Sequence, residues 1–351
     1  MHFLTIFHIF WRAIVHPIAA PESLDSSSKK KMMALVLFVW VVCVASFIYT
    51  VWWKKNLFEK IMIQTQAYER LFQQLKITGA LPSKRKVTYI TRIFVTFVIC
   101  MTLVDAVGID LRLQTRWDFY TTIMHNANYE YFFQNNLNPE GQSTALKLVA
   151  GYRFVAATYG VILTFYTYCF AVAFAMLLFW LTEGFLKVAK QRFLLTNIDQ
   201  VLNLFDSLVE ISDLYEECLG TMFSCYCLVL LPMHSFKFTQ AMTDGDPWKY
   251  VPVLLYLLVW LSFMFISAHT NYMLKSITRF LRPQIRQLET FSISKVEYHQ
   301  RLSIESILLN EISGNNFGIR GIGFTITYGL FGNLVGLVVT CIVIISQINF
   351  V

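Results

Sequence analysis

Residues 148–181 read LVAGYRFVAATYGVILTFYTYCFAVAFAMLLFWL, and this stretch decides the fold. Its single charged side chain is that of Arg153. An uncharged run of about twenty residues is long enough to cross the hydrocarbon core of a bilayer. Because a backbone in lipid must satisfy its own hydrogen bonds, such a run is predicted to be an α-helix. The stretch therefore indicates an integral membrane protein, with membrane lipid as its surroundings.

Further apolar blocks flank this stretch, at residues 32–53, 94–109, 219–236, 251–274 and 324–347. A weaker block at residues 3–20 contains Arg12 and His16; it either spans the bilayer, lies at the interface or is the remnant of a longer first helix. The composition agrees, since 56% of the residues are hydrophobic and only 15% are charged, less charge than a soluble domain carries. We predict an all-α polytopic membrane protein, a single unit over residues 1–351, with seven transmembrane helices of which the first is weak.

Basic residues mark the cytoplasmic side of a membrane protein. The net charge of +7 would suggest nucleic acid in a soluble protein, but here Lys and Arg lie between the apolar blocks and act as topology signals, so we expect no nucleic-acid partner. Segments 54–92 and 275–323 contain nine and seven basic residues, whereas 110–147, 182–217 and 237–250 contain three, three and two. Placing the two richest segments inside puts the C-terminus outside. The N-terminus is then inside if residues 3–20 span, and outside if they do not.

The segments assigned to the inside have helical patterning of their own. In segment 182–217 the apolar residues that share one helical face are Leu194, Ile198, Val201, Phe205 and Leu208. Segments 57–77 and 301–312 look similar. We predict that these segments extend the membrane helices into a packed cytoplasmic layer. For segment 57–77 a helix lying on the membrane surface is the alternative.

The sequence contains no recognisable catalytic motif. There is no H-E-x-x-H, no G-x-S-x-G and no phosphate-binding glycine loop, and the seven histidines are scattered. The seven cysteines all lie in or at the edges of apolar blocks, which predicts no extracellular disulfide framework. We therefore predict no enzymatic activity, no metal site and no cofactor.

Two charged residues fall within or near the outer ends of apolar blocks, Asp105 and Arg153. Charged side chains within a membrane are costly and often functional. They either form an ion pair, reach the outer surface with their charged ends, or contact a ligand directly.

The last block, within FGIRGIGFTITYGLFGNLVGLVVTCIVIISQINF at residues 317–350, contains uncharged polar residues at a regular interval. Asn333, Thr340 and Gln347 are seven apart, so they form one stripe along a helix. A weakly polar stripe on an apolar helix suits the lining of a pore made where several subunits meet. Ordinary hydrogen bonding between neighbouring helices is the alternative.

The run 340–347, TCIVIISQ, resembles the signature of insect gustatory receptors, which is Thr-Tyr, five mostly hydrophobic residues and Gln near the C-terminus. The upstream FGIRGIGFTI also looks like the segment that opens the last helix in that family. The sequence departs from the pattern at Cys341, Ser346 and Ile348. The long basic inner segments and the long helix at 148–181 are similar to the family layout.

This resemblance implies a tastant-gated, non-selective cation channel in the plasma membrane of a sensory neuron. Four subunits, identical or related, would surround one pore. Residues 275–351 would supply a cytoplasmic anchor helix and the pore-lining helix, and residues 1–274 six membrane helices with a ligand pocket in their outer half. The motif match places Thr340, Cys341 and Gln347 at the pore, with Ile344 between them and Gln347 near the outer gate.

Pocket residues are implied by helix position only, and the candidates are Tyr152, Tyr159, Tyr256 and Trp260, with Asp105 and Arg153 nearby. Aromatic side chains with a polar end can bind small ligands. Simple packing is the alternative for each of them.

Two other classes of protein compete with the channel. A G-protein-coupled receptor needs an inside C-terminus, and the chain lacks D-R-Y after a third helix, N-P-x-x-Y in the last helix and an outer-loop cysteine. A transporter or membrane enzyme calls for charges near the bilayer midplane or broken helices in paired halves.

Overall fold

The computed structural model describes residues 27–75, 81–82, 84–108, 144–192, 198–229, 247–288 and 317–349, with the isolated positions 7, 124, 127, 131, 235, 238, 299 and 306. The weak block at residues 3–20 and segment 301–312 therefore lie outside the described residues, apart from Phe7 and Ser306.

The described elements are α-helices, one π-helical turn and one short hairpin. They are α3 (Ser27–Trp53), α4 (Lys55–Gln74), α5 (Lys84–Gly108), α7 (Thr144–Arg192), α8 (Ile198–Ser224), η3 (Cys225–Val229), α10 (Pro247–Leu288), β1 (Arg320–Gly321), β2 (Phe324–Thr325) and α12 (Tyr328–Asn349). The apolar blocks predicted from the sequence fall mainly on α3, α5, α7, the end of α8 with η3, α10 and α12. The prediction of an all-α polytopic membrane fold is confirmed.

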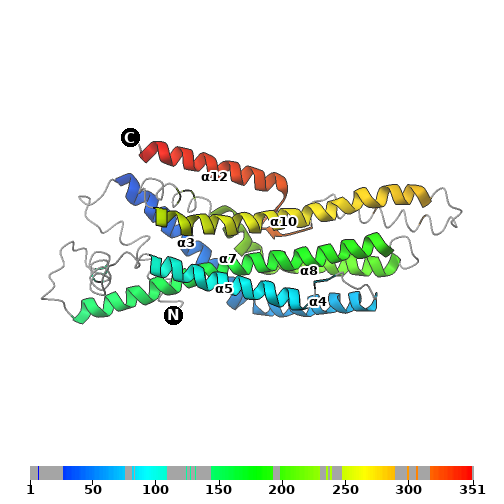
Figure 1. Cartoon of the computed structure of the whole chain (residues 1–351), viewed down its shortest axis with the longest axis horizontal. Coiled ribbons are helices and arrows are strands. Elements are labelled where there is room, and N and C mark those ends of the chain that lie inside the picture. The colour runs from blue at the N-terminus through cyan, green and yellow to red at the C-terminus, as the bar shows by residue number, and fades with distance from the viewer. Residues whose placement is uncertain are drawn as a thin grey trace.

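The helices lie along one long axis and alternate in direction (Figure 1). Helices α3, α7 and α10 run one way, and α5, α8 and α12 run back, so the C-terminal end of α12 lies at the same end of the bundle as the starts of α3, α7 and α10. The ends that adjoin the Lys- and Arg-rich segments lie at the opposite end. This arrangement is the relative topology that the charge distribution predicts.

Some of these helices are longer than a bilayer is thick. Helix α7 has 49 residues, about 70 Å at ~1.5 Å per residue, whereas the hydrocarbon core measures about 30 Å. Within the described residues, length and apolar composition mark Ile162–Lys190 and Val253–Ser276 as candidate membrane spans, and Val41–Trp53 and Tyr328–Ile344 as shorter apolar helices. Helices α7 and α10 are therefore longer than the hydrocarbon core is thick.

Helices α4 and α8 build the predicted inner layer beside the end of α7. On α8 the predicted face is buried at Val201, Phe205 and Leu208, and the side chains of Leu194 and Ile198 lie outside the described residues. Tyr68 of α4 is fully buried and its hydroxyl donates a hydrogen bond to the Leu181 carbonyl at 3.1 Å. The described part of segment 57–77, up to Leu75, is thus packed into the protein and does not lie alone on a membrane surface. Burial raises the pKa of the Tyr68 phenol well above its usual value.

Candidate functional site

An aromatic cluster lies where α7, η3 and α10 meet; we define it as Phe165, Tyr168, Tyr226, Tyr256 and Trp260. The Tyr256 ring stacks on Phe165 with centroids 4.9 Å apart and lies 5.2 Å from the ring of Tyr168. Tyr168 in turn makes an edge contact with Tyr226 at 4.8 Å. The Trp260 indole donates a hydrogen bond to the Tyr226 carbonyl at 3.1 Å. All five side chains are buried.

The Tyr226 hydroxyl is the polar atom of this cluster that is buried without a hydrogen bond among the described residues. It is completely buried and has no hydrogen-bond partner within the described part of the chain. Burying a hydroxyl without a partner costs about 1–3 kcal/mol. Tyr226 also belongs to the π-helical turn η3, and such turns occur frequently at functional sites. The unsatisfied hydroxyl and the π-helical turn together make this cluster the candidate site.

The structure separates the four aromatic residues predicted for the pocket. Tyr256 and Trp260, which are 4% and 0% exposed, belong to the aromatic cluster. Tyr159 is partly buried and packs against the main core. Tyr152 makes an edge contact with Tyr131 at 6.2 Å. It lies thirteen residues before Phe165 on α7, so about 20 Å from it along the helix axis.

Sequence reasoning missed three members of the cluster. Phe165 and Tyr168 are three apart on α7 and so share a face with one another, a spacing that was available in the sequence. Tyr226 gave no such signal, because its position depends on how α8 ends and on where that end meets α10.

The structure leaves the predicted contact between Asp105 and Arg153 untested. Asp105 lies on α5, three residues before that helix ends at Gly108, but its side chain is outside the described set. Arg153 lies near the start of α7 and is partly buried. The two helices pack against each other in opposite directions, so an ion pair between them stays a prediction.

The polar stripe of α12 faces away from the rest of the chain. Helix α12 lies at the edge of the bundle beside α10 (Figure 1), with Leu334 and Val338 buried. Asn333, Thr340 and Gln347 are exposed. The Thr340 hydroxyl bonds to the carbonyl one turn earlier, at 2.9 Å.

Neither the Asn333 nor the Gln347 side-chain amide has a hydrogen-bond partner within the described residues. Within the described residues, the side chains of the stripe therefore form no hydrogen bond to another helix, and the Thr340 bond stays inside α12. Of the other motif residues on α12, Ile344 is exposed and Cys341 is partly buried.

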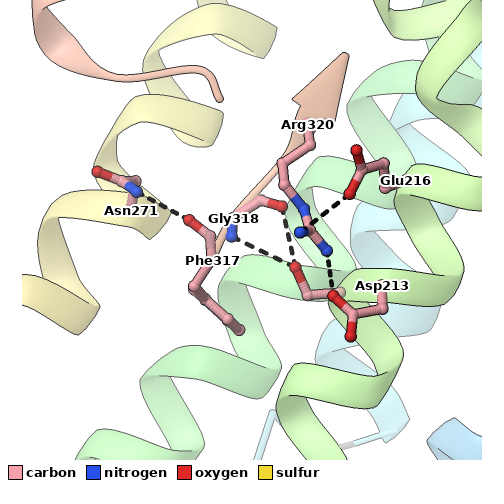
Figure 2. Close-up of polar contacts among 7 residues, drawn as sticks. Asp213, Glu216, Asn271, Phe317, Gly318 and Arg320 are labelled. Atoms are coloured by element: carbon pink, nitrogen blue, oxygen red, sulfur yellow. Dashed lines mark hydrogen bonds and ion pairs between the residues drawn. The ribbon is translucent and has the colours of Figure 1, made fainter. Parts of the chain in front are cut away.

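A short hairpin leads into α12. Strands β1 and β2 pair Arg320 with Thr325 and Gly321 with Phe324. Figure 2 shows Arg320 between two carboxylates of α8: it forms an ion pair with Asp213, and another with Glu216 at 2.9 Å. A Cβ at Gly321 would collide with the Phe324 ring and lie 2.6 Å from the Ser224 hydroxyl, so a larger residue there would have to displace both side chains. The family resemblance of this segment implied that it opens the last helix, but nothing in the sequence indicated the ion pairs.

No group of three or more His, Cys, Asp or Glu side chains in the described residues is arranged to hold a metal ion.

Comparison with known proteins gives a match at the level of structure alone. No protein-family model matches the chain, and no curated protein is similar to it in sequence. The structure of the insect olfactory receptor OR5 from Machilis hrabei is similar over 99% of this chain and 88% of that chain, with 13% identity and a TM-score of 0.51. The two chains share one fold. The same receptor in complex with eugenol gives 14% identity, the same coverage and the same TM-score.

Proposed function

We propose that the chain is a chemosensory receptor that works as a ligand-gated cation channel in the plasma membrane. The observation that carries this proposal is the uncharged polar stripe on the exposed face of α12, where Asn333 and Gln347 have no partner in the described chain. Unsatisfied amides facing lipid are unfavourable, whereas in a pore they contact water. The fold shared with an insect olfactory receptor, and the resemblance of residues 340–347 to the gustatory-receptor signature, support the same function.

Four copies of the chain, or of related chains, would place this stripe around a common axis. Leu334 and Val338 hold α12 against α10, so the opposite face is free to meet the other copies. A lining of amide and hydroxyl groups carries no fixed charge, and we expect it to discriminate weakly among monovalent cations. Thr340, Ile344 and Gln347 occupy the outward-running half of α12, with Gln347 near its end.

The aromatic cluster is the proposed ligand site. Its walls are aromatic, and the Tyr226 hydroxyl offers one unsatisfied hydrogen-bonding group. We infer a small, largely apolar ligand with one polar group, such as a tastant. The olfactory receptor of the same fold has been determined with eugenol, a molecule of this type. A ligand that binds the open state more tightly than the closed state shifts the population toward conduction.

Current recordings test this proposal. The chain is expressed in cells without other chemoreceptors, and eugenol and a panel of small aromatic alcohols and sugars are applied from outside. We expect an inward cation current that at least one compound evokes and that carries Na⁺ and K⁺ about equally. A chain that reaches the surface as a tetramer but gives no current, with or without compounds, would contradict the channel.

The rival receptor class requires an inside C-terminus. The structure places the end of α12 at the opposite end of the bundle from the Lys- and Arg-rich segments, which are expected to be cytoplasmic. No observation in the described structure favours a transporter or a membrane enzyme.

A further inference from the structure

The hairpin before α12 is fixed to α8 through its backbone. The Ser212 hydroxyl donates to the Gly318 carbonyl at 3.1 Å and accepts from the Gly318 N–H at 3.3 Å. Further along α8, the Ser224 hydroxyl accepts from the Ile322 N–H at 2.7 Å. These two serines lie twelve residues apart, about 18 Å along the helix. The hairpin is therefore attached along more than three turns of α8.

Arg320 adds two charged contacts between these serines. Asp213 and Glu216 are three residues apart and thus neighbours on the surface of α8. The Arg320 side chain is only 13% exposed, against 60% for Asp213 and 42% for Glu216. Ion-paired hydrogen bonds of this kind are stronger than neutral ones. The largely buried Arg320 guanidinium therefore links the hairpin to the two more exposed carboxylates of α8.

The hairpin also contacts α10 and continues directly into α12. The Asn271 amide donates to the Phe317 carbonyl at 2.8 Å (Figure 2). Only Ile326 and Thr327 separate β2 from α12, and Thr327 accepts from the Leu330 N–H at 3.2 Å, as a helix cap does. No flexible spacer lies between the hairpin and the first turn of α12.

At its C-terminal end α8 also reaches the aromatic cluster. Ser224, which bonds to the hairpin, is the last residue of α8, and the π-helical turn η3 begins at the next residue. Tyr226 of η3 contacts Tyr168 and accepts the indole hydrogen bond of Trp260. One continuous helix thus connects the proposed ligand site with the segment that positions the proposed pore helix.

We propose that Arg320 is a positioning residue, which couples α8, and through it the aromatic cluster, to the first turn of α12. This inference rests on the proposed function of a ligand-gated channel. Arg320 touches neither ligand nor ions. It holds the hairpin so that a displacement of η3 along α8 moves the start of α12.

The experiment compares the full-length wild-type chain with Arg320→Gln, Glu216→Gln, the double variant and Arg320→Lys in proteoliposomes. The matched control is Glu183→Gln, which removes a carboxylate paired with Lys187 at 2.9 Å on α7, away from the hairpin. Two quantities are measured without any ligand: the Na⁺ flux per reconstituted protein, and amide hydrogen exchange over residues 328–334.

We expect Arg320→Gln to change the basal flux at least about fivefold, the lower range of coupling between sites, and to speed exchange in the first turn of α12. The double variant should change no more than Arg320→Gln, because both substitutions break the same contact. Arg320→Lys should recover part of the effect, and Glu183→Gln should behave as wild type.

Wild-type flux and wild-type exchange in Arg320→Gln would overturn the inference, as would fully additive effects in the double variant. Faster exchange without flux in any chain, also after eugenol and the other test compounds are added, would support the positioning role and instead contradict the proposed channel.

Discussion

Helices α8 and α12 differ in how much of their surface is packed against the rest of the chain. Helix α8 is packed by α4, α7, α3 and the hairpin, and its inward side chains Leu204, Phe205 and Leu208 are almost fully buried. Helix α12 buries Leu334 and Val338, while much of its remaining surface, polar stripe included, is exposed. Helix α8 is packed within its own chain, whereas the exposed polar face of α12 is the surface that we propose to meet other copies of the chain. Substitutions on the two helices should therefore affect different properties.

The largest effect on stability is expected on α8. Phe205 is buried and contacts the ring of Phe185 at 5.6 Å, so Phe205→Ala removes a large side chain from the core. We expect a loss of about 3–5 kcal/mol in unfolding free energy, measured by denaturant titration in detergent. The matched change on α12 is Val339→Ala, at a residue that is 55% exposed, and it should cost less than ~0.5 kcal/mol. Equal losses of unfolding free energy in Phe205→Ala and Val339→Ala would contradict the contrast between α8 and α12.

The largest effect on conduction is expected on α12. Thr340→Lys would place a ring of positive charges around the proposed pore and should lower the cation current at least about tenfold, a barrier of about 1.4 kcal/mol. Because Thr340 is exposed, the thermal midpoint of the purified chain should change little. Thr340→Ser is the control and should conduct as wild type does. A wild-type current in the Thr340→Lys variant would mean that Thr340 does not line the pore.

A smaller and more selective effect is expected at Tyr226. Tyr226→Phe removes a buried hydroxyl that has no partner in the described chain, so the unfolding free energy should stay the same or rise slightly. The half-maximal concentration of a hydroxyl-bearing activator should increase about five- to tenfold, the value of one neutral hydrogen bond. Tyr215→Phe removes another buried, unpartnered hydroxyl, away from the aromatic cluster, and should leave the response unchanged. An equal increase of the half-maximal concentration in both variants would mean that Tyr226 does not bind the ligand.

The smallest effect is expected in the inner layer. Tyr68→Phe deletes the hydrogen bond to the Leu181 carbonyl and should cost about 1 kcal/mol. Because burial raises the Tyr68 pKa above the usual 10.0, this phenol stays neutral when folded, and its contribution is lost as pH rises above 10. The stability difference between wild type and Tyr68→Phe should therefore shrink in that range. A difference that is constant with pH would mean that Tyr68 ionises freely in the folded chain.

Much of the fold could be predicted from the sequence, because apolar run length and basic-residue placement are local signals. The predicted blocks fall on the observed helices, and the face of α8 at Val201, Phe205 and Leu208 is buried as its spacing indicated. The site could be predicted only in part. Tyr256 and Trp260 fall in the aromatic cluster, but Tyr226 and the Arg320 ion pairs depend on contacts between residues some 34 and 107 positions apart. Such long-range contacts leave no periodic pattern in the sequence.

The central claim is that the exposed stripe of α12 lines a pore shared by several copies of the chain. Its most direct test is block of the cation current by a membrane-impermeant, positively charged thiol reagent applied from outside. The chain used combines Gln347→Cys with Cys341→Ser, and Cys341→Ser alone is the control. We predict an irreversible fall in current in the first chain and none in the control. An unchanged current in the first chain, with the new thiol shown to be labelled, would contradict the account.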